Sequence, residues 1–249
     1  MATLCMHKSA LVCRAVTHRY LVNICNLNSY TCLTLPAFKK ETLSEENRAR
    51  CVASLRSSRL GRLGAQDAAQ GRKKAAVLVP LCIVGGEPAL LYTLRSSRLR
   101  RNGGQVSFPG GLQDEGDAGL RDTVLRETRE ELGISGDVVD VWGHGPFLPA
   151  ADASVCVRPY LGYVGEIDIA RLAVNDAEVA QVFSTPLRTL CDPENFAFTQ
   201  FRSGYVIPVY RCAGHRIWGL TALITHLVLA SLLPNIYRNK LKLIPHLKT

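Results

Sequence analysis

The sequence predicts an α/β protein in which a mixed β-sheet is covered by helices on both faces. Two apolar runs, residues 75–84 and 89–94, are separated by Gly85-Gly86-Glu87-Pro88, which is typical of a β-hairpin. Longer segments with helical character follow, one that includes residues 126–132 and one at residues 220–233, with strand-like runs between them. This mixture of a hairpin with crossover helices favours a mixed sheet between two helical layers.

The first predicted element is a helix near the N-terminus. Thr42-Leu43-Ser44-Glu45 has the pattern of a capping box, and we expect the helix to run to about Leu63. A polar linker, residues 64–74, leads to the hairpin. The closing helix, residues 220–233, contains no internal proline or glycine. Further strands are expected at residues 105–108, 138–142, 155–164 and 205–210.

The predicted helix that includes residues 126–132 carries the most informative pattern in the chain. One stripe of it can face a core, and this stripe consists of Leu120, Val124, Thr128 and Leu132. Glu127, Glu130 and Glu131 stand at positions i, i+3 and i+4, so they project from one face within roughly 100°. Crowding like charges in this way costs roughly 0.2–0.5 kcal/mol per pair, and Arg126 offers the local relief.

Such a cluster of oxygen ligands suits Mg²⁺, which prefers carboxylates together with water and substrate phosphate. The simpler explanation is a solvated charged helix face, which is what most charge runs on helices are. A glycine pair favours the metal site, because Gly110 and Gly111 follow Phe108-Pro109 and lead through a loop to the helix. Glycines there let the backbone approach a phosphate or a metal closely. Asp117 is expected to cap the helix N-terminus.

Residues 111–134 resemble the Nudix box, in which a glycine and a spaced acid precede the pattern REUXEEXGU, where U is aliphatic. Thr128 stands where an aliphatic residue is usual, and Asp117 lies one position before the usual place of the earlier acid, Ala118. Six specified residues in nine match behind the glycine loop, which makes this resemblance specific. They are Arg126, Glu127, Glu130, Glu131, Gly133 and Ile134.

A second block resembles the signature that precedes the box in the coenzyme A diphosphatase subgroup of the Nudix superfamily, whose members also have an acid with the spacing of Asp117. Among vertebrate members the mitochondrial form is more similar than the peroxisomal one. The resemblance continues through residues 215–225, covers residues 75–233, and implies a Nudix-type α/β/α sandwich with a mixed β-sheet. The matching residues of this second block are Leu90, Leu91, Thr93, Arg95, Ser96, Leu99, Gly104 and Phe108-Pro109-Gly110-Gly111.

The chemistry indicated by the box is metal-assisted hydrolysis of a diphosphate. Mg²⁺ or Mn²⁺ would offset charge on phosphate oxygens and lower the pKa of a bound water. Glu127 and Glu131, one turn apart, are the first expected ligands, and Glu130 is a further ligand or orients the water. The resemblance implies that the Gly110 carbonyl completes the coordination. Arg126 is expected to orient the glutamates rather than to bind substrate.

The general base stays open at this point, because Nudix enzymes take it from the helix or from a distant loop. Three loop acids could serve, although surface exposure is the simpler explanation for each: Glu166, Asp176 and Glu178.

Substrate binding is expected from Arg95, Gly110 and Gly111. Arginine presents a rigid fork that suits phosphate, and coenzyme A carries a 3′-phosphate besides its diphosphate. Arg95 is preferred over its neighbours because it lies in the subgroup signature, whereas a solubilising basic loop would explain the others equally well. These neighbours are Arg98, Arg100 and Arg101.

The charge is distributed unevenly along the chain. Residues 1–74 hold 13 Lys and Arg against 4 Asp and Glu, whereas residues 75–249 hold 17 of each. The neutral catalytic segment gives no support to a nucleic-acid footprint. Residues 1–40 contain no acid and carry spaced basic residues, which is typical of a mitochondrial transit peptide, with a disordered basic tail as the alternative.

The nine cysteines show no CxxC pair, so we expect reduced structural thiols rather than zinc or disulfides. The apolar run in residues 220–233 is too short to span a bilayer, and residues 234–249 are expected to form a C-terminal tail. The expected assembly is a monomer.

The sequence therefore predicts a mitochondrial Nudix hydrolase that cleaves coenzyme A and its thioesters into 3′,5′-ADP and 4′-phosphopantetheine or its acyl derivative. One alternative is another Nudix activity, on ADP-ribose, NADH or dinucleoside polyphosphates, because the box contacts only the diphosphate. A second alternative is a non-catalytic Nudix binding module. The retained glutamate cluster argues against that alternative, because a binding module has no need of this repulsion.

Overall fold

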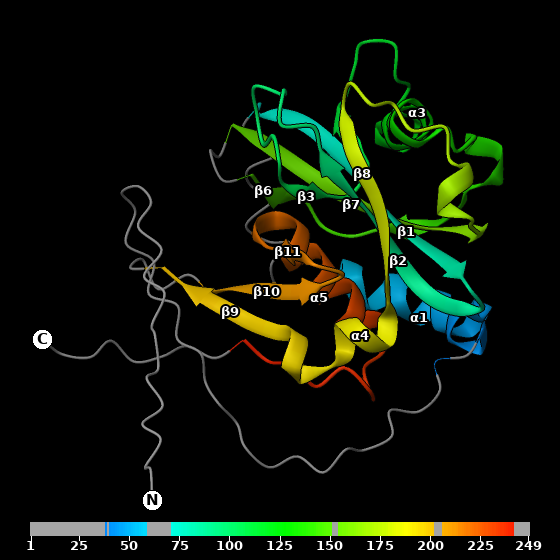
Figure 1. Ribbon diagram of the computed structural model, residues 1–249, viewed down its shortest axis with the longest axis vertical. Helices are drawn as coiled ribbons and strands as arrows, with labels where there is room; N and C mark the ends of the chain where they lie inside the picture. The colour runs from blue at the N-terminus through cyan, green and yellow to red at the C-terminus, as the bar shows by residue number, and fades with distance from the viewer. Residues whose placement is uncertain (1–37, 39, 59–70, 151–153, 202–205, 242–249) are drawn as a thin grey trace, which may run out of the picture.

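The computed structural model describes residues 38, 40–58, 71–150, 154–201 and 206–241. Strands β1 (Lys73–Val84) and β2 (Glu87–Arg95) form the expected hairpin (Figure 1). Its turn is only two residues long, because Gly85 and Gly86 both have positive φ, +57° and +81°. Glycine adopts these angles without a steric cost, and such a turn matches the twist of the flanking strands.

The main sheet is mixed, with the strand order β3-β2-β1-β7-β5. β1 and β7 run parallel, and the other pairs are antiparallel. β1 and β2 pair only close to their turn and then separate, so β4 pairs with the free part of β1 and β3 with the free part of β2. The remaining strands of this sheet are β3 (Val106–Ser107), β4 (Gly110–Leu112), β5 (Asp140–His144), β6 (Leu148–Pro149), β7 (Val155–Glu166) and β8 (Val179–Pro186).

Helices cover both faces of this sheet, which confirms the α/β/α sandwich (Figure 1). α3 (Leu120–Leu132) packs on one face through its apolar stripe. α1 (Glu45–Arg56) and α5 (Gly219–Leu232) contact each other and pack on the opposite face.

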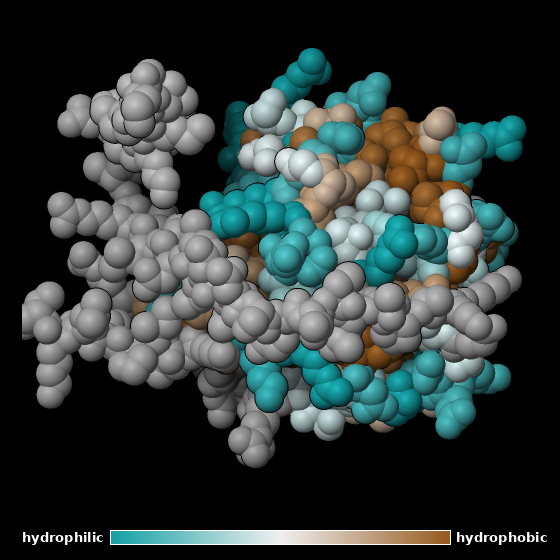
Figure 2. Space-filling model, turned by 60° about the horizontal axis from the view of Figure 1, so that its bottom comes forward, coloured by the Kyte–Doolittle hydropathy of each residue, from teal (hydrophilic) through white to brown (hydrophobic). Residues whose placement is uncertain are grey.

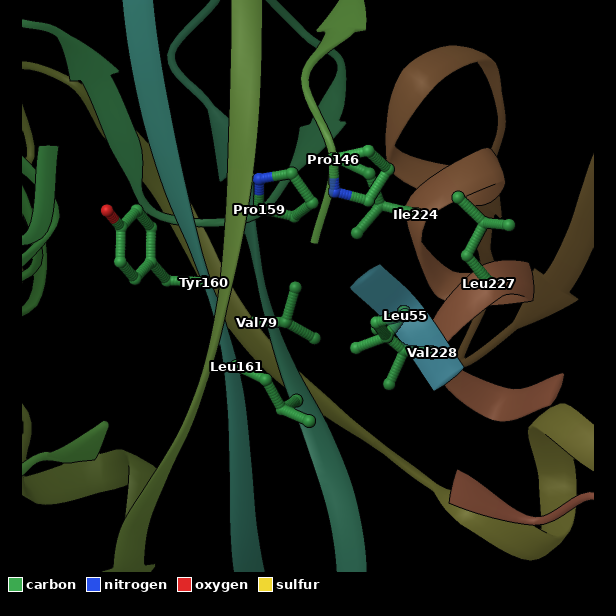
Figure 3. A pocket seen from close by; sticks show the side chains of 9 residues that line it. All are labelled: Leu55, Val79, Pro146, Pro159, Tyr160, Leu161, Ile224, Leu227 and Val228. Atoms are coloured by element: carbon green, nitrogen blue, oxygen red, sulfur yellow. The ribbon is translucent and has the colours of Figure 1, made fainter. Parts of the chain in front are cut away.

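Side chains of β7 alternate between these two faces, as the strand period of two requires. Figure 3 shows Pro159 and Leu161 pointing toward α1 and α5, whereas the Tyr160 side chain points to the other side. The small gap between the sheet and these helices is apolar; it is lined by Leu55, Val79, Pro146, Pro159, Tyr160, Leu161, Ile224, Leu227 and Val228.

A second, three-stranded sheet with the order β11-β10-β9 packs against α5. Its strands are β9 (Phe196–Gln200), β10 (Val206–Cys212) and β11 (His215–Ile217), of which only β10 was predicted. The short helices are α4 (Leu187–Cys191), η1 (Lys40–Leu43), η2 (Gly136–Val138), η3 (Ile169–Arg171) and η4 (Pro193–Asn195).

Three local predictions were wrong. The N-terminal helix is capped by Ser44 rather than started by Thr42, because the Ser44 side chain accepts the Asn47 N–H, and it ends at Arg56 instead of Leu63. Residues 73 and 74 belong to β1 rather than to the linker. The glycine loop is strand β4, since residues 110–112 pair with β1.

Several other expectations lie outside the described residues. They concern most of the transit peptide (1–37 and 39), the end of the predicted N-terminal helix (59–63), much of the linker (64–70) and the end of the C-terminal tail (242–249). In the part that the structure describes, no helix is both long and apolar enough to cross a membrane. On the face drawn in Figure 2, hydrophilic side chains surround separate hydrophobic areas.

None of the five described cysteines takes part in a disulfide, and all five are buried. They are distributed over five elements, α1, β1, β7, α4 and β10, so each packs in a different part of the core. They are Cys51, Cys82, Cys156, Cys191 and Cys212.

Candidate active site

Helix α3 holds the glutamate cluster against the sheet. Its apolar stripe is buried as predicted, which fixes the rotation of the helix. The helix ends at Gly133, whose left-handed φ of 69° lets its N–H bond the Arg129 carbonyl. It begins after Gly119, so the prediction that Asp117 caps it was wrong. Instead, the Asp117 carboxylate accepts from the Thr123 hydroxyl and from Arg126.

Glu131 lies at the centre of the site with 1% of its side chain exposed. Arg95 Nη1 is 3.4 Å from Oε1, and the Gly110 N–H donates to the same carboxylate, whereas the buried Oε2 has no partner among the described residues. The pKa of Glu131 is raised to about 8, mainly by burial; Arg95 opposes this shift, and the charges of Glu127 and Glu178 add to it.

Glu127 lies one turn earlier and faces strand β4. Its side chain is 14% exposed, and a Cβ at Gly111 would overlap with its carboxylate. The absent side chain at Gly111 is therefore what lets this carboxylate lie against the β4 backbone. Burial raises the pKa of Glu127, and nearby Arg126 opposes the shift.

Arg126 connects the acids around the start of α3. Its Nε is 3.0 Å from Asp117 Oδ1, and its Nη1 lies 3.1 Å from both Glu127 Oε1 and Glu130 Oε2. These bonds hold the pKa of Asp117 well below its usual range and raise that of Arg126. The guanidinium therefore contacts Glu127 and Glu130 together, and its role in orienting them stays a prediction.

Glu130 differs from the other two glutamates because 46% of its side chain is exposed. The part of the chain that the structure describes contains no ready-made group of three His, Cys, Asp or Glu side chains with metal-binding geometry. The donors nevertheless fit a hard divalent cation, since Glu131 Oε2 is buried without a partner beside a second, largely buried carboxylate.

Glu178 is the loop acid that the fold brings to this cluster. Its carbonyl accepts the Ser96 N–H at 2.8 Å, and the Asn175 N–H in the same turn donates to the Glu131 carbonyl. The Glu178 charge raises the pKa of both Glu127 and Glu131.

The other two loop acids are not brought to the cluster. Glu166 lies beside Tyr163 at the end of β7, and Asp176 is exposed. Three of the arginines before the glycine pair are also exposed, in the loop that connects β2 and β3: Arg98, Arg100 and Arg101.

Comparison with known proteins identifies this arrangement. The profile of the NUDIX domain matches residues 72–204, which is more than half of the chain. The chain belongs to the Nudix family. Divalent metal ions are generally needed by Nudix hydrolases.

Relatives with a stated activity or family cover most of this chain. "Mitochondrial coenzyme A diphosphatase NUDT8" of Homo sapiens is 45% identical over 207 residues, which is 81% of this chain and 84% of the relative. "Nudix hydrolase 3" of Caenorhabditis elegans is 31% identical over 240 residues, 90% of this chain and 95% of the relative. A crystal structure of a MutT/nudix family protein from Enterococcus faecalis covers 74% of this chain and 72% of its own with 17% identity and a TM-score of 0.45, too low to add to the assignment.

In Nudix terms, the box runs from β4 through α3, and the preceding signature supplies β2, β3 and the start of β4. The two blocks, which adjoin in the sequence, also meet in space, because Glu131 of the box contacts Arg95 and Gly110 of the preceding signature.

Proposed function

We propose that this Nudix protein is a metal-dependent hydrolase that cleaves the diphosphate of coenzyme A and acyl-CoA. The products are 3′,5′-ADP and 4′-phosphopantetheine or its acyl derivative. The observation that carries the proposal is the convergence of Arg95 and Gly110 on Glu131, since it joins the subgroup signature to the box chemistry. The 45% identity to a relative named as a coenzyme A diphosphatase supports the same substrate.

The metal would be Mg²⁺ or Mn²⁺, held by Glu127 and Glu131 with Glu130 and the Gly110 carbonyl as further donors. When bound, such an ion offsets charge on the phosphate oxygens and lowers the pKa of water. Glu131 contributes an oxygen that is buried and without a partner among the described residues, and Glu127 contributes a carboxylate fixed against β4.

The protein side chains have separate roles in this proposal. Arg126 orients Glu127 and Glu130 through its two contacts of 3.1 Å. Glu130, whose carboxylate reaches solvent, orients the attacking water. Glu178 is the carboxylate that accepts the proton of this water, because it lies close enough to Glu127 and Glu131 to raise their pKa values.

Substrate binding is proposed for Arg95, Gly110 and Gly111. The Arg95 side chain is 22% exposed beside Glu131, so one side of its guanidinium can contact the diphosphate. We further propose that the protein is mitochondrial, that residues 1–40 are its transit peptide, and that it acts as a monomer. The printed name of the human relative supports the location.

A panel of coenzyme A, acyl-CoA, ADP-ribose, NADH and a dinucleoside polyphosphate, with Mg²⁺ or Mn²⁺ and product mass as the readout, tests the substrate. Coenzyme A compounds should be hydrolysed with the highest kcat/KM, and EDTA should abolish the activity. Faster hydrolysis of ADP-ribose than of coenzyme A would refute the assignment to the coenzyme A diphosphatase subgroup, while the assignment to the Nudix family would stand. Binding without any hydrolysis would instead support the non-catalytic alternative.

A further inference from the structure

The hairpin formed by β10 and β11 presents a positively charged outer face. Its turn, Ala213-Gly214, pairs Cys212 with His215, and the register therefore places Arg211 directly opposite Arg216. Like charges directly opposite each other destabilise a strand pair. Neither arginine has a carboxylate within ion-pair distance in the part of the chain that the structure describes.

An exposed tryptophan extends this face. Cys212 and Ile217 point into the core, so the alternation of side chains places Arg216 and Trp218 on the outer side. Trp218 is 41% exposed, and the guanidinium carbon of Arg216 lies 5.8 Å from its ring centroid. The next residue, Gly219, has a φ of +65° that turns the chain directly into α5. An indole beside two arginines that lack acidic partners is a suitable surface for an aromatic group that carries a phosphate.

This face lies close to the proposed catalytic site. β11 contacts β3 (Figure 1), and the Thr221 hydroxyl in the first turn of α5 donates to the Val106 carbonyl at 3.0 Å. Val106 pairs with Leu94, the residue before Arg95. One short strand and one helical turn therefore separate Trp218 from the arginine that contacts Glu131.

We propose that Trp218 and Arg216, with Arg211 beside them, bind the 3′-phosphoadenosine end of the substrate. The adenine stacks on the indole of Trp218, and the 3′-phosphate accepts hydrogen bonds from Arg216. This inference rests on the proposed function for the identity of the ligand. It also assigns the 3′-phosphate to an arginine without an acidic partner among the described residues, whereas Arg95 contacts Glu131.

Trp218 itself provides the direct test. The chain contains two tryptophans, so in Trp142→Phe the fluorescence comes from Trp218 alone. Titration with adenosine 3′,5′-bisphosphate in EDTA should quench this emission, because a stacked base contacts the indole. Adding Arg216→Ala should weaken the bisphosphate roughly tenfold and leave AMP, which lacks the 3′-phosphate, nearly unchanged. No saturable quenching, or equal weakening of both nucleotides, would overturn the proposal.

Kinetics separate this inference from the proposed function. In the wild-type background, Trp218→Ala should raise KM for coenzyme A roughly tenfold with little change in kcat. Arg171→Ala is the matched control, because that side chain is 86% exposed on η3 and 3.8 Å from Asp168. Hydrolysis of coenzyme A with an unchanged KM in Trp218→Ala would refute the subsite and leave the function standing. Quenching by the bisphosphate without hydrolysis of coenzyme A would support the subsite and refute the proposed function.

Discussion

Replacing Glu131 by glutamine should stabilise the metal-free protein while removing its activity. Burial raises the pKa of Glu131 from 4.5 to about 8. A raised pKa means that the folded state holds the proton more tightly than the unfolded state. The contribution of Glu131 to the stability of the fold is therefore fully present below pH 4.5 and is lost as the pH rises through 8. Above that pH, the charged carboxylate costs the folded state at most about 5 kcal/mol.

Glutamine removes the charge and keeps the size, and its Oε1 can still accept from Arg95 and Gly110. Its amide must itself be buried, so we expect a gain of about 2 kcal/mol at pH 8.5. For a domain of this size, that gain corresponds to a rise in Tm of about 4–8 °C. At pH 5 the two proteins should differ much less. Glu46→Gln, at an exposed position in the first turn of α1, is the control and should change Tm little at either pH.

Thermal unfolding in EDTA at both pH values measures this effect. Addition of Mg²⁺ should then raise the Tm of the wild type more than that of Glu131→Gln, since an ion that binds only the folded state stabilises it. Turnover should fall on the order of a hundredfold in the variant. An equal Tm difference at pH 5 and pH 8.5 would refute the burial argument, and near-wild-type turnover with saturating Mg²⁺ would refute the ligand role.

Four further changes probe the glycine pair, the signature arginine and the N-terminal segment. Gly111→Ala should fold but lose at least about tenfold in kcat, because its Cβ displaces the end of the Glu127 side chain. Gly110→Ala should unfold, since its φ is +150° and its Cβ meets the backbone of β1. Circular dichroism and activity measurements distinguish the two variants. Arg95→Ala should lower kcat/KM roughly tenfold or more for both coenzyme A and its 3′-dephospho analogue if Arg95 serves the diphosphate, and selective loss on coenzyme A would instead assign it the 3′-phosphate. Deleting residues 1–40 should release a mitochondrial reporter fusion into the cytosol with purified activity unchanged, and continued import would place the address elsewhere.

The sequence predicted the elements whose patterns are local. The stripe and the glutamate spacing of α3 indicated a helix, although its start was misplaced at Asp117, and the β1–β2 hairpin followed from two apolar runs around a glycine pair. Strand β8 was missed because its exposed and buried residues follow no clean alternation and it ends at Pro186. β11 has only three residues, too few for any periodic signal.

The sequence indicated candidate site residues, but it could not give the environments in which the fold places them. Helical spacing places Glu127, Glu130 and Glu131 on one face, yet only the packing of α3 against β1 and β4 shows that Glu131 is buried and Glu130 is not. Asp117 was expected to accept from the first backbone N–H groups of α3, but it accepts from the Asp114 N–H before the helix, from the Thr123 hydroxyl and from a guanidinium nine residues away. Glu178 reaches the cluster through a turn tied to α3, which no local pattern reveals.

The buried cysteines can report local unfolding of the elements that contain them. Burial raises the pKa of Cys51, Cys82 and Cys191 to about 12, and that of Cys212 to about 11, so almost no thiolate exists at neutral pH while the core is closed. A thiol reagent can therefore modify each one only after its own element has opened to solvent. Mass spectrometry of the modified peptides would rank α1, β1, α4 and β10 by the free energy of their local unfolding, without introducing a single probe.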